Sequence, residues 1–254
     1  FFILILKLLY CYYCQIALAR FWAAKLRRFS HSSKYFLKKS AFGSYIFCIF
    51  AIIMEKICLS ESESAVIEHH PFEPFLPEGA RLLMLGTFPP AEKRWCMKFY
   101  YPNFINDMWR IFGICFFDDK EHFVVAGEKR FDLERIIPFL KEKGIALFDT
   151  ATRVRRTKNT ASDKDLEIVE ATDLDAMLRA LPACKAVVTA GQLATEVFCN
   201  HYGIAVPKVG ECASFSLDGR NLRLFRMPSS SRAYPMKAER KAEFYQNVFK
   251  FLEL

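Results

Sequence analysis

The stretch Arg81-Leu-Leu-Met-Leu-Gly86 is a short, continuous apolar run that ends in a turn containing Pro89 and Pro90. Runs of this kind are typical of strands that are buried on both faces of a parallel sheet. Three further runs have the same character, at residues 144–149, 185–190 and 221–227. The sequence therefore predicts a mainly parallel sheet of four strands.

Helical patterns lie between and around these runs. Apolar residues recur at spacings of three and four, with polar residues between them, in the stretches 103–112, 133–143, 174–181, 192–201 and 236–252. Alternation of strand and helix predicts an α/β fold, a three-layer α/β/α sandwich with the sheet in the middle. In such folds the site lies at the carboxyl ends of the strands, so the loops after Leu85, Leu147, Val188 and Phe225 should converge.

Charge divides the chain into two parts. The formal net charge is +8, but residues 1–53 carry eight Lys or Arg and no Asp or Glu, so the remaining residues hold equal numbers of basic and acidic side chains. We expect residues 1–53 to be a non-native upstream extension, with Met54 as the natural start, and residues 54–254 to form a single domain. A membrane anchor over residues 1–19 and an organelle transit peptide are the alternative interpretations.

Cysteine and histidine patterns do not indicate a metal or cofactor site. The nine cysteines are scattered, and the only Cys-x-x-Cys, Cys11 to Cys14, lies in the suspect extension. We expect reduced cysteines in a cytoplasmic, monomeric protein that uses no cofactor and no metal, and that has no membrane contact if residues 1–53 are not native. The adjacent His69 and His70 are expected to be ordinary surface residues.

The loops after the predicted strands carry a distinctive set of side chains. One loop reads Gly86-Thr-Phe-Pro-Pro90 and is followed by an aromatic stretch from Phe99 to Trp109. Another begins at Asp149, and the last runs from Met227 through Ser and Arg residues to Pro235. Aromatic rings, carboxamides, a carboxylate and a Ser/Arg loop before a helix suit a planar base and a phosphate backbone.

These segments resemble the signatures of the uracil-DNA glycosylase superfamily. The loop from Gly86 to Pro90 is similar to the family's Gly-x-Asn-Pro-Gly, and the stretch Tyr100 to Trp109 matches the Tyr-Tyr-Pro-Asn-x-x-Asn-x-x-Trp segment that follows it. Pro228-Ser-Ser-Ser-Arg232 resembles the Pro-Ser loop. The resemblance runs from about Pro71 to the C-terminus and is closest to the hypoxanthine-DNA glycosylase and mismatch-specific uracil-DNA glycosylase branch.

The resemblance implies a monofunctional DNA glycosylase of base excision repair whose partner is damaged DNA. Such an enzyme flips out a deaminated base, uracil or hypoxanthine, and hydrolyses its N-glycosidic bond with water, leaving an abasic site. The implied base-binding residues are Gly86, Thr87, Phe88, Tyr100, Tyr101 and Asp149. The alternative is a catalytically silent glycosylase-like domain that binds nucleic acid or a nucleotide.

The chain departs from the family at the position that usually holds the water. Phe88 stands where many relatives have Asn or Asp, and Pro90 replaces the usual Gly. The resemblance suggests Asn103 and Asn106, three apart at a predicted helix start, as the catalytic residues. Asn103 is equally explained as a helix N-cap, whereas Asn106 is expected inside the helix.

Three remaining polar features have two interpretations each. Asp149 accepts hydrogen bonds and so would read N–H donors on a base edge, or it forms a cap or an ion pair with Arg153 or Arg155. The basic run 153–158 is a solvated loop or a phosphate contact. Ser229, Ser230, Ser231 and Arg232 are expected to bind DNA, with Arg232 or Tyr234 as the wedge, although a Ser could instead cap the helix that follows. For Trp109, Phe112 and the Phe residues of the last helix we expect core positions.

Overall fold

The computed structural model describes residues 66–158, 160 and 162–254. The predicted extension at residues 1–53 and its boundary at Met54 lie outside these residues. Within the described part, the fold combines a mainly parallel sheet, a small antiparallel sheet and five α-helices.

The central sheet contains all four predicted strands and one more. Its order is β3-β2-β6-β8-β7. The first four strands run parallel to one another, and β7 pairs antiparallel with β8 at the edge. Their bounds are β2 Leu82–Gly86, β3 Ile145–Asp149, β6 Ala186–Ala190, β7 Cys212–Leu217 and β8 Arg220–Met227. The prediction of a mixed α/β fold is confirmed, with five strands in this sheet instead of four.

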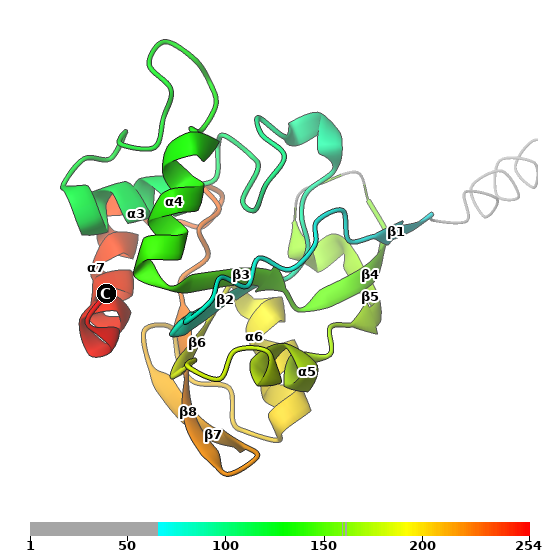
Figure 1. Ribbon diagram of the computed structural model, residues 1–254. Helices are drawn as coiled ribbons and strands as arrows, with labels where there is room; N and C mark the ends of the chain where they lie inside the picture. Colours follow the sequence, from blue (N-terminus) through cyan, green and yellow to red (C-terminus); the bar gives the residue numbers. More distant parts are fainter. Residues whose placement is uncertain (1–65, 159, 161) are drawn as a thin grey trace, which may run out of the picture. The chain divides into compact units, whose positions relative to one another are not determined.

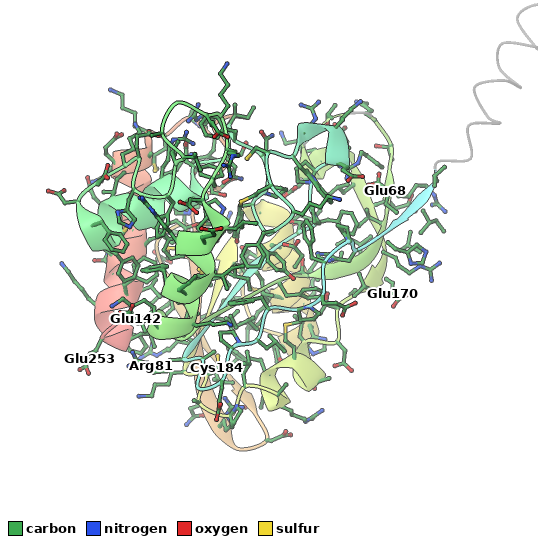
Figure 2. The ribbon with its side chains drawn as sticks, turned by 45° about the horizontal axis from the view of Figure 1, so that its top comes forward. Glu68, Arg81, Glu142, Glu170, Cys184 and Glu253 are labelled. Carbon is green, nitrogen blue, oxygen red and sulfur yellow. The ribbon has the colours of Figure 1, made fainter. Side chains whose placement is uncertain are left out.

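The five helices lie on both sides of this sheet in Figure 1, where α3, α4 and α7 are seen on one side and α5 and α6 on the other. Arg81, at the start of β2, donates hydrogen bonds to the carbonyl oxygens of Leu252 and Glu253 and so ties the end of the last helix to the sheet (Figure 2). The helices are α3 Met108–Phe117, α4 Leu133–Lys143, α5 Leu174–Arg179, α6 Gln192–Tyr202 and α7 Ala238–Leu252.

Helix α3 begins five residues later than the prediction of a helix over 103–112. The side-chain oxygen of Asn103 accepts a hydrogen bond from the backbone N–H of Ile105, and that of Asn106 accepts one from Met108. Such local side-chain bonds favour turns over helix, because they satisfy backbone donors in a non-helical conformation. Asn103 and Asn106 therefore lie in turns before the helix, and the prediction that Asn106 is inside it is wrong.

The sequence reasoning missed a second, antiparallel sheet. Its order is β1-β4-β5, with β1 at Ile67–His69, β4 at Ala151–Arg156 and β5 at Leu166–Ala171. Arg153 and Arg155 on β4 form ion pairs with Glu170 and Glu167 on β5 (Figure 2 labels Glu170). Residues 153–156 of the basic run are thus a strand with cross-strand charge pairs and not a solvated loop.

The core is built around aromatic rings between α3 and α7. Trp109, Phe112 and Tyr245 are fully buried, and Phe112 stacks on both Trp109 and Phe249. The prediction of core positions is confirmed for Trp109, Phe112 and Phe249, whereas for Phe251 it is wrong, because that side chain is 50% exposed. Two 3₁₀ turns, η1 at Glu92–Arg94 and η2 at Asp163–Asp165, lie in the loops beside the sheet.

None of the helices in residues 66–158, 160 and 162–254 is long and apolar enough to cross a bilayer.

Shortening a side chain in the central strand should destabilise the whole domain. Leu83 is completely buried on β2, so Leu83→Ala leaves a cavity between sheet and helices and should lower the free energy of unfolding by about 2–5 kcal/mol. Val206 is 41% exposed, and Val206→Ala should change it by less than about 0.5 kcal/mol. Chemical denaturation measures both; equal effects would contradict the assignment of β2 to the core.

Candidate active site

The loops after the parallel strands meet at one edge of the sheet. Gly86 and Asp149 are register partners at the ends of β2 and β3. Asn106 and Ser231 form an isolated antiparallel bridge, which joins the segment before α3 to the loop after β8. The structure therefore brings the predicted segments together at the carboxyl ends of the strands, as expected for an α/β sheet.

Asp149 is held by a histidine that the sequence reasoning placed at the surface. Oδ2 of Asp149 lies 3.0 Å from Nε2 of His70, and the two side chains are only 10% and 4% exposed. The imidazole nitrogen thus lies at hydrogen-bond distance from one carboxylate oxygen and orients the carboxylate. The expectation that His70 is an ordinary surface residue is wrong, and Asp149 pairs with it instead of with Arg153 or Arg155.

Gly86, which has no side chain, leaves room for Oδ1, the other carboxylate oxygen of Asp149. A Cβ atom at Gly86 would collide with Oδ1 of Asp149, so only glycine lets the carboxylate lie over the end of β2. The contact with His70 uses Oδ2, and within the part of the chain that the structure describes Oδ1 accepts no hydrogen bond. The carboxylate is thus oriented on one side and open to a ligand on the other.

Phe88 forms part of an aromatic wall around His70. Its ring packs edge-on to the imidazole at 5.4 Å, and Phe148 lies 4.5 Å away on another side. Nδ1 of His70 lies 2.7 Å from the carbonyl oxygen of Phe72. Phe88 therefore positions a polar pair through packing, since its own side chain has no atom that could hold water.

Tyr100 and Tyr101 have different environments. Tyr100 is buried, its hydroxyl donates to the carbonyl of Glu73, and its own carbonyl accepts from Nε1 of Trp109. Tyr101 has a left-handed backbone with φ of 49°, and its buried hydroxyl has no hydrogen-bond partner among the residues that the structure describes. Burial raises the pKa of the Tyr101 phenol, and the charges of Tyr245 and Asp149 raise it further. A strained backbone and an unsatisfied buried hydroxyl make Tyr101 the better candidate for a ligand contact.

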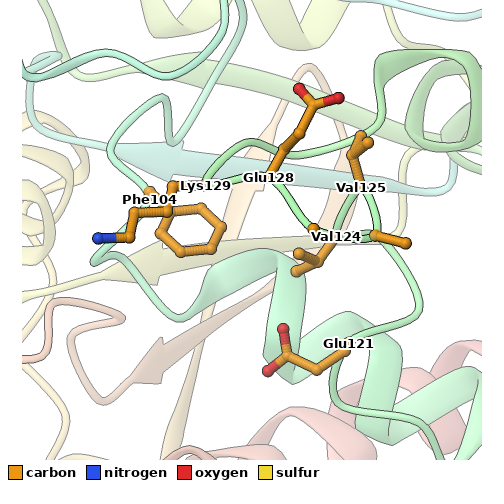
Figure 3. Close-up of a pocket in the computed structure, with 8 residues that line it drawn as sticks. Phe104, Glu121, Val124, Val125, Glu128 and Lys129 are labelled. Carbon is orange, nitrogen blue, oxygen red and sulfur yellow. The ribbon is translucent and has the colours of Figure 1, made fainter.

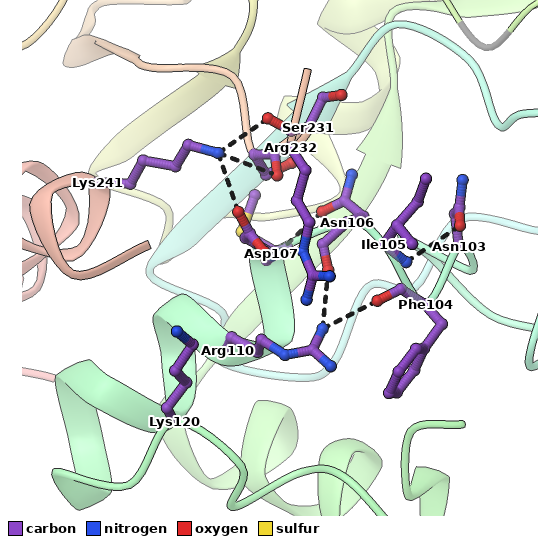
Figure 4. Close-up of polar contacts among 12 residues, drawn as sticks. Asn103, Phe104, Ile105, Asn106, Asp107, Arg110, Lys120, Ser231, Arg232 and Lys241 are labelled. Carbon is purple, nitrogen blue, oxygen red and sulfur yellow. Dashed lines mark hydrogen bonds and ion pairs between the residues drawn. The ribbon is translucent and has the colours of Figure 1, made fainter. Parts of the chain in front are cut away.

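Asp107 joins the two loops through a buried ion pair (Figure 4). Its Oδ2 lies 3.1 Å from Nζ of Lys241, which is completely buried, and its Oδ1 accepts from Nε of Arg232 at 2.8 Å. Lys241 also donates to the carbonyl of Ser231, and the backbone N–H of Asp107 donates to the carbonyl of Ser230. The sequence carried a signal for this network: Lys241 stands on the apolar face of α7.

The Ser loop is shaped by its own hydroxyls. Oγ of Ser229 accepts from the backbone N–H of Ser231, and Oγ of Ser231 accepts from Ala233. Ser230 is buried, whereas the side chain of Arg232 is 45% exposed. Helix α7 begins after Lys237 without a side-chain cap, so the interpretation of a Ser as its cap is wrong.

The basic run 153–158 is neutralised by acidic neighbours. Arg156 makes a bidentate contact with Glu68 and also donates to the carbonyl of Pro89, which fixes the loop after β2 to β1. Lys158 pairs with Asp165 at 3.6 Å. Together with the two cross-strand pairs of β4, these contacts leave little free charge in the run for phosphate binding.

Thr87 points to a carboxylate that the sequence reasoning did not single out. Its Oγ1 donates to Oδ2 of Asp163 at 2.9 Å, so η2 is fastened to the end of β2. Burial raises the pKa of the Asp163 carboxyl; the hydrogen bond from Thr87 and the charge of Arg156 lower it, and the charge of Asp149 raises it. Nothing in the sequence near Asp163 distinguishes it from the other acidic residues of the loop.

The described residues contain no group of three or more His, Cys, Asp or Glu side chains arranged to hold a metal ion. An open hollow of about 500 Å³ lies beside Phe104 and is lined otherwise by residues 121 and 124–129 (Figure 3). Its lining includes neither Gly86 nor Asp149, so it is separate from the strand-end cluster.

A solved structure shares this fold. It is the solution NMR structure of a "putative Uracil DNA glycosylase" from Methanosarcina acetivorans, 21% identical in sequence, with a TM-score of 0.52. The match covers 74% of this chain and 100% of that one. No protein-family model and no curated protein sequence matches the chain. At this identity the likeness establishes a common fold, and activity has to be argued from the site.

Removing the buried cation should destabilise the protein through the two loops. Lys241→Met leaves Asp107 buried with only Arg232 to compensate it, so the free energy of unfolding should fall by about 3 kcal/mol. Adding Asp107→Asn should recover part of the loss, because the uncompensated charge is gone.

The matched control is Lys120→Met, which breaks an exposed ion pair with Glu239 and should change stability little. Urea denaturation of the four proteins measures the effects. A Lys241→Met protein as stable as the Lys120→Met protein would contradict the structural role of this network.

Proposed function

We propose that the protein is a monofunctional DNA glycosylase that hydrolyses the N-glycosidic bond of a flipped-out deaminated base, uracil or hypoxanthine, and leaves an abasic site. The observation that carries the proposal is the convergence of a half-satisfied buried carboxylate, Asp149, with a Ser/Arg loop at one edge of the sheet. The fold shared with the archaeal protein supports it. A carboxylate can bind the edge of a flipped-out base, and a Ser/Arg loop can bind the phosphate backbone.

In this proposal, Asp149 reads the edge of the base. Oδ1 accepts hydrogen bonds, so it selects a base that presents an N–H, as uracil and hypoxanthine both do. His70 holds the carboxylate in place, and Gly86 allows its approach. Tyr101 supplies an aromatic ring and an unsatisfied hydroxyl beside it, while Tyr100 and Phe88 form the wall behind.

The asparagines act as donors in this scheme. The side-chain oxygens of Asn103 and Asn106 already accept backbone hydrogen bonds, so their NH₂ groups are the parts left for a ligand. Amide donors beside the base stabilise the negative charge that develops on it as the bond breaks. This assigns Asn103 and Asn106 to the departing base.

The DNA contact is local. Arg232 keeps its Nη atoms available because its pair with Asp107 uses Nε, and the loop's backbone and hydroxyls lie beside it. With the run 153–158 neutralised, the Ser229 to Arg232 loop is the proposed phosphate-binding element. Tyr234 follows it, and either Tyr234 or Arg232 is the proposed wedge.

The same proposal includes a monomeric, cytoplasmic protein with a single domain over residues 54–254 and a three-layer arrangement, which the helices on both sides of the sheet in Figure 1 support.

One observation favours a second function, a glycosylase-like domain that binds nucleic acid without cleaving it. Phe88 cannot hold water, and the oxygens of both asparagines are occupied by the backbone. If no other residue receives the proton of water, the site binds a base and leaves its bond intact.

Cleavage of lesion-containing DNA decides between these functions. The full chain, incubated with duplexes that carry uracil or hypoxanthine and then treated with alkali, should give strand breaks at the lesion. Asn106→Ala should lower the single-turnover rate by about 100-fold, because a donor to the departing base is lost. Asn247→Ala, on the exposed side of α7, is the control and should retain the wild-type rate. Lesion-specific binding without breaks would favour the silent domain.

A further inference from the structure

A carboxylate at the centre of the strand-end cluster has no role yet. Asp163 comes from η2, far in sequence from the other site residues, and its Oδ2 accepts the hydroxyl of Thr87 at the end of β2. The same oxygen lies 3.6 Å from where a Cβ of Gly191, the residue after β6, would be. Asp163 is therefore placed between the carboxyl ends of two neighbouring strands.

We propose that Asp163 is the catalytic carboxylate that activates the water and stabilises the positive charge of the sugar during base release. This inference rests on the proposed glycosylase function. Phe88 cannot hold the water, so another residue has to take that role. Asp163 lies outside the three signature segments, and the hydroxyl of Thr87 orients its carboxylate.

The charge of Asp163 is not used by the fold. Arg156, whose charge lowers the pKa of the Asp163 carboxyl, is itself bound to Glu68 and to the carbonyls of Pro89 and Thr160. Within the described residues, the Asp163 carboxylate accepts a hydrogen bond from the Thr87 hydroxyl and forms no ion pair. Structural carboxylates that are removed from water are usually paired, so an unpaired one at a strand-end cluster indicates a functional group.

The other polar groups of the site are less able to receive a proton. Asp149 is bound to His70 through Oδ2, and in the proposed function its Oδ1 accepts the N–H of the base. The oxygens of Asn103 and Asn106 accept backbone N–H groups, and amides are poor bases. Asp107 is bound to Lys241 and Arg232, so Asp163 is the remaining carboxylate of the cluster, and among the described residues its Oδ1 has no hydrogen-bond partner.

The proposed step balances without a further reactant. The C1′–N bond breaks and its electron pair leaves with the base, while the oxygen of water forms a bond to C1′. Asp163 takes a proton from that water and passes it to solvent, and the base anion takes up a proton. An ionised carboxylate near C1′ stabilises the oxocarbenium-like state through its charge as well as through proton transfer.

The acid side of the pH profile should report this group. Asp163 is faced by Asp149 from β3, by Arg156 from β4 and by the Thr87 hydroxyl from β2, and burial is the largest cause of its raised pKa. As the pH is lowered, the cleavage rate should therefore begin to fall at a pH above the usual pKa of an aspartate, because protonation removes the ionised carboxylate that the step needs. In Asp163→Asn this fall should disappear with most of the rate.

The first arm of the test is single-turnover cleavage. Asp163→Asn keeps the shape and an acceptor for Thr87, yet should lower the rate at least about 100-fold while the dissociation constant for the lesion duplex changes less than about threefold. Asp165→Asn is the matched control on the same 3₁₀ turn, because Asp165 pairs with Lys158 outside the cluster. Equal rates in the two variants would overturn the proposal.

The second arm does not depend on cleavage. Duplexes carrying a cationic pyrrolidine or a neutral tetrahydrofuran at the lesion site imitate the sugar with and without its transition-state charge. Wild type and Asp165→Asn should bind the cationic duplex at least about tenfold more tightly than the neutral one, and Asp163→Asn should lose this preference. A preference that persists in Asp163→Asn overturns the inference. A wild type that shows the Asp163-dependent preference but cuts no lesion overturns the proposed hydrolysis alone.

Discussion

The ion pair between Lys241 and Asp107 is the contact on which the arrangement of the site depends. Burying an ammonium group is unfavourable unless all of its hydrogens form hydrogen bonds. Lys241 donates to Asp107 and to the carbonyl oxygens of Ser230 and Ser231. These partners belong to the loop after β8 and to the segment before α3, which are joined again by the Asn106–Ser231 bridge. A single side chain on α7 thus fixes both loops relative to the sheet.

The elements of this fold that can be predicted are those with a recognisable pattern of apolar residues in the sequence. The strands β2, β3 and β6 were predictable because every residue in them is buried, so each is a nearly continuous apolar run. The strand β8 buries Leu222, Leu224 and Met227 but exposes polar residues between them, so its apolar pattern is weaker. The antiparallel strands β1, β4 and β5 were missed because their residues are charged on exposed faces and pair across strands, as Arg153 does with Glu170. The start of α3 was misplaced because Asn103 and Asn106 bind backbone N–H groups two residues on, which a count of apolar spacing does not register.

The candidate site was predictable where the parallel order of the strands alone brings its residues together. Gly86 and Asp149 stand at strand ends, so the rule of parallel sheets placed them together, and register confirms that they are partners. His70 contacts Asp149, 79 positions away in sequence, and Asp163 contacts Thr87, 76 positions away. No local sequence pattern marks such distant pairs. Asp107 fell inside the predicted helix over 103–112 and was not singled out, although a lysine on the apolar face of α7 implied a buried partner.

Charge is distributed in a way that restricts how DNA could be held. The basic residues of β4 are cancelled by glutamates, and the remaining excess of the chain falls in residues 1–53, outside the described part. Binding through bulk charge would therefore be weak in this domain, and a lesion would have to be held by contacts at the site itself. In the proposed function Arg232 meets both demands, because Asp107 fixes Nε while the side chain as a whole is 45% exposed. The buried ion pair that orders the loop therefore also aims its only arginine.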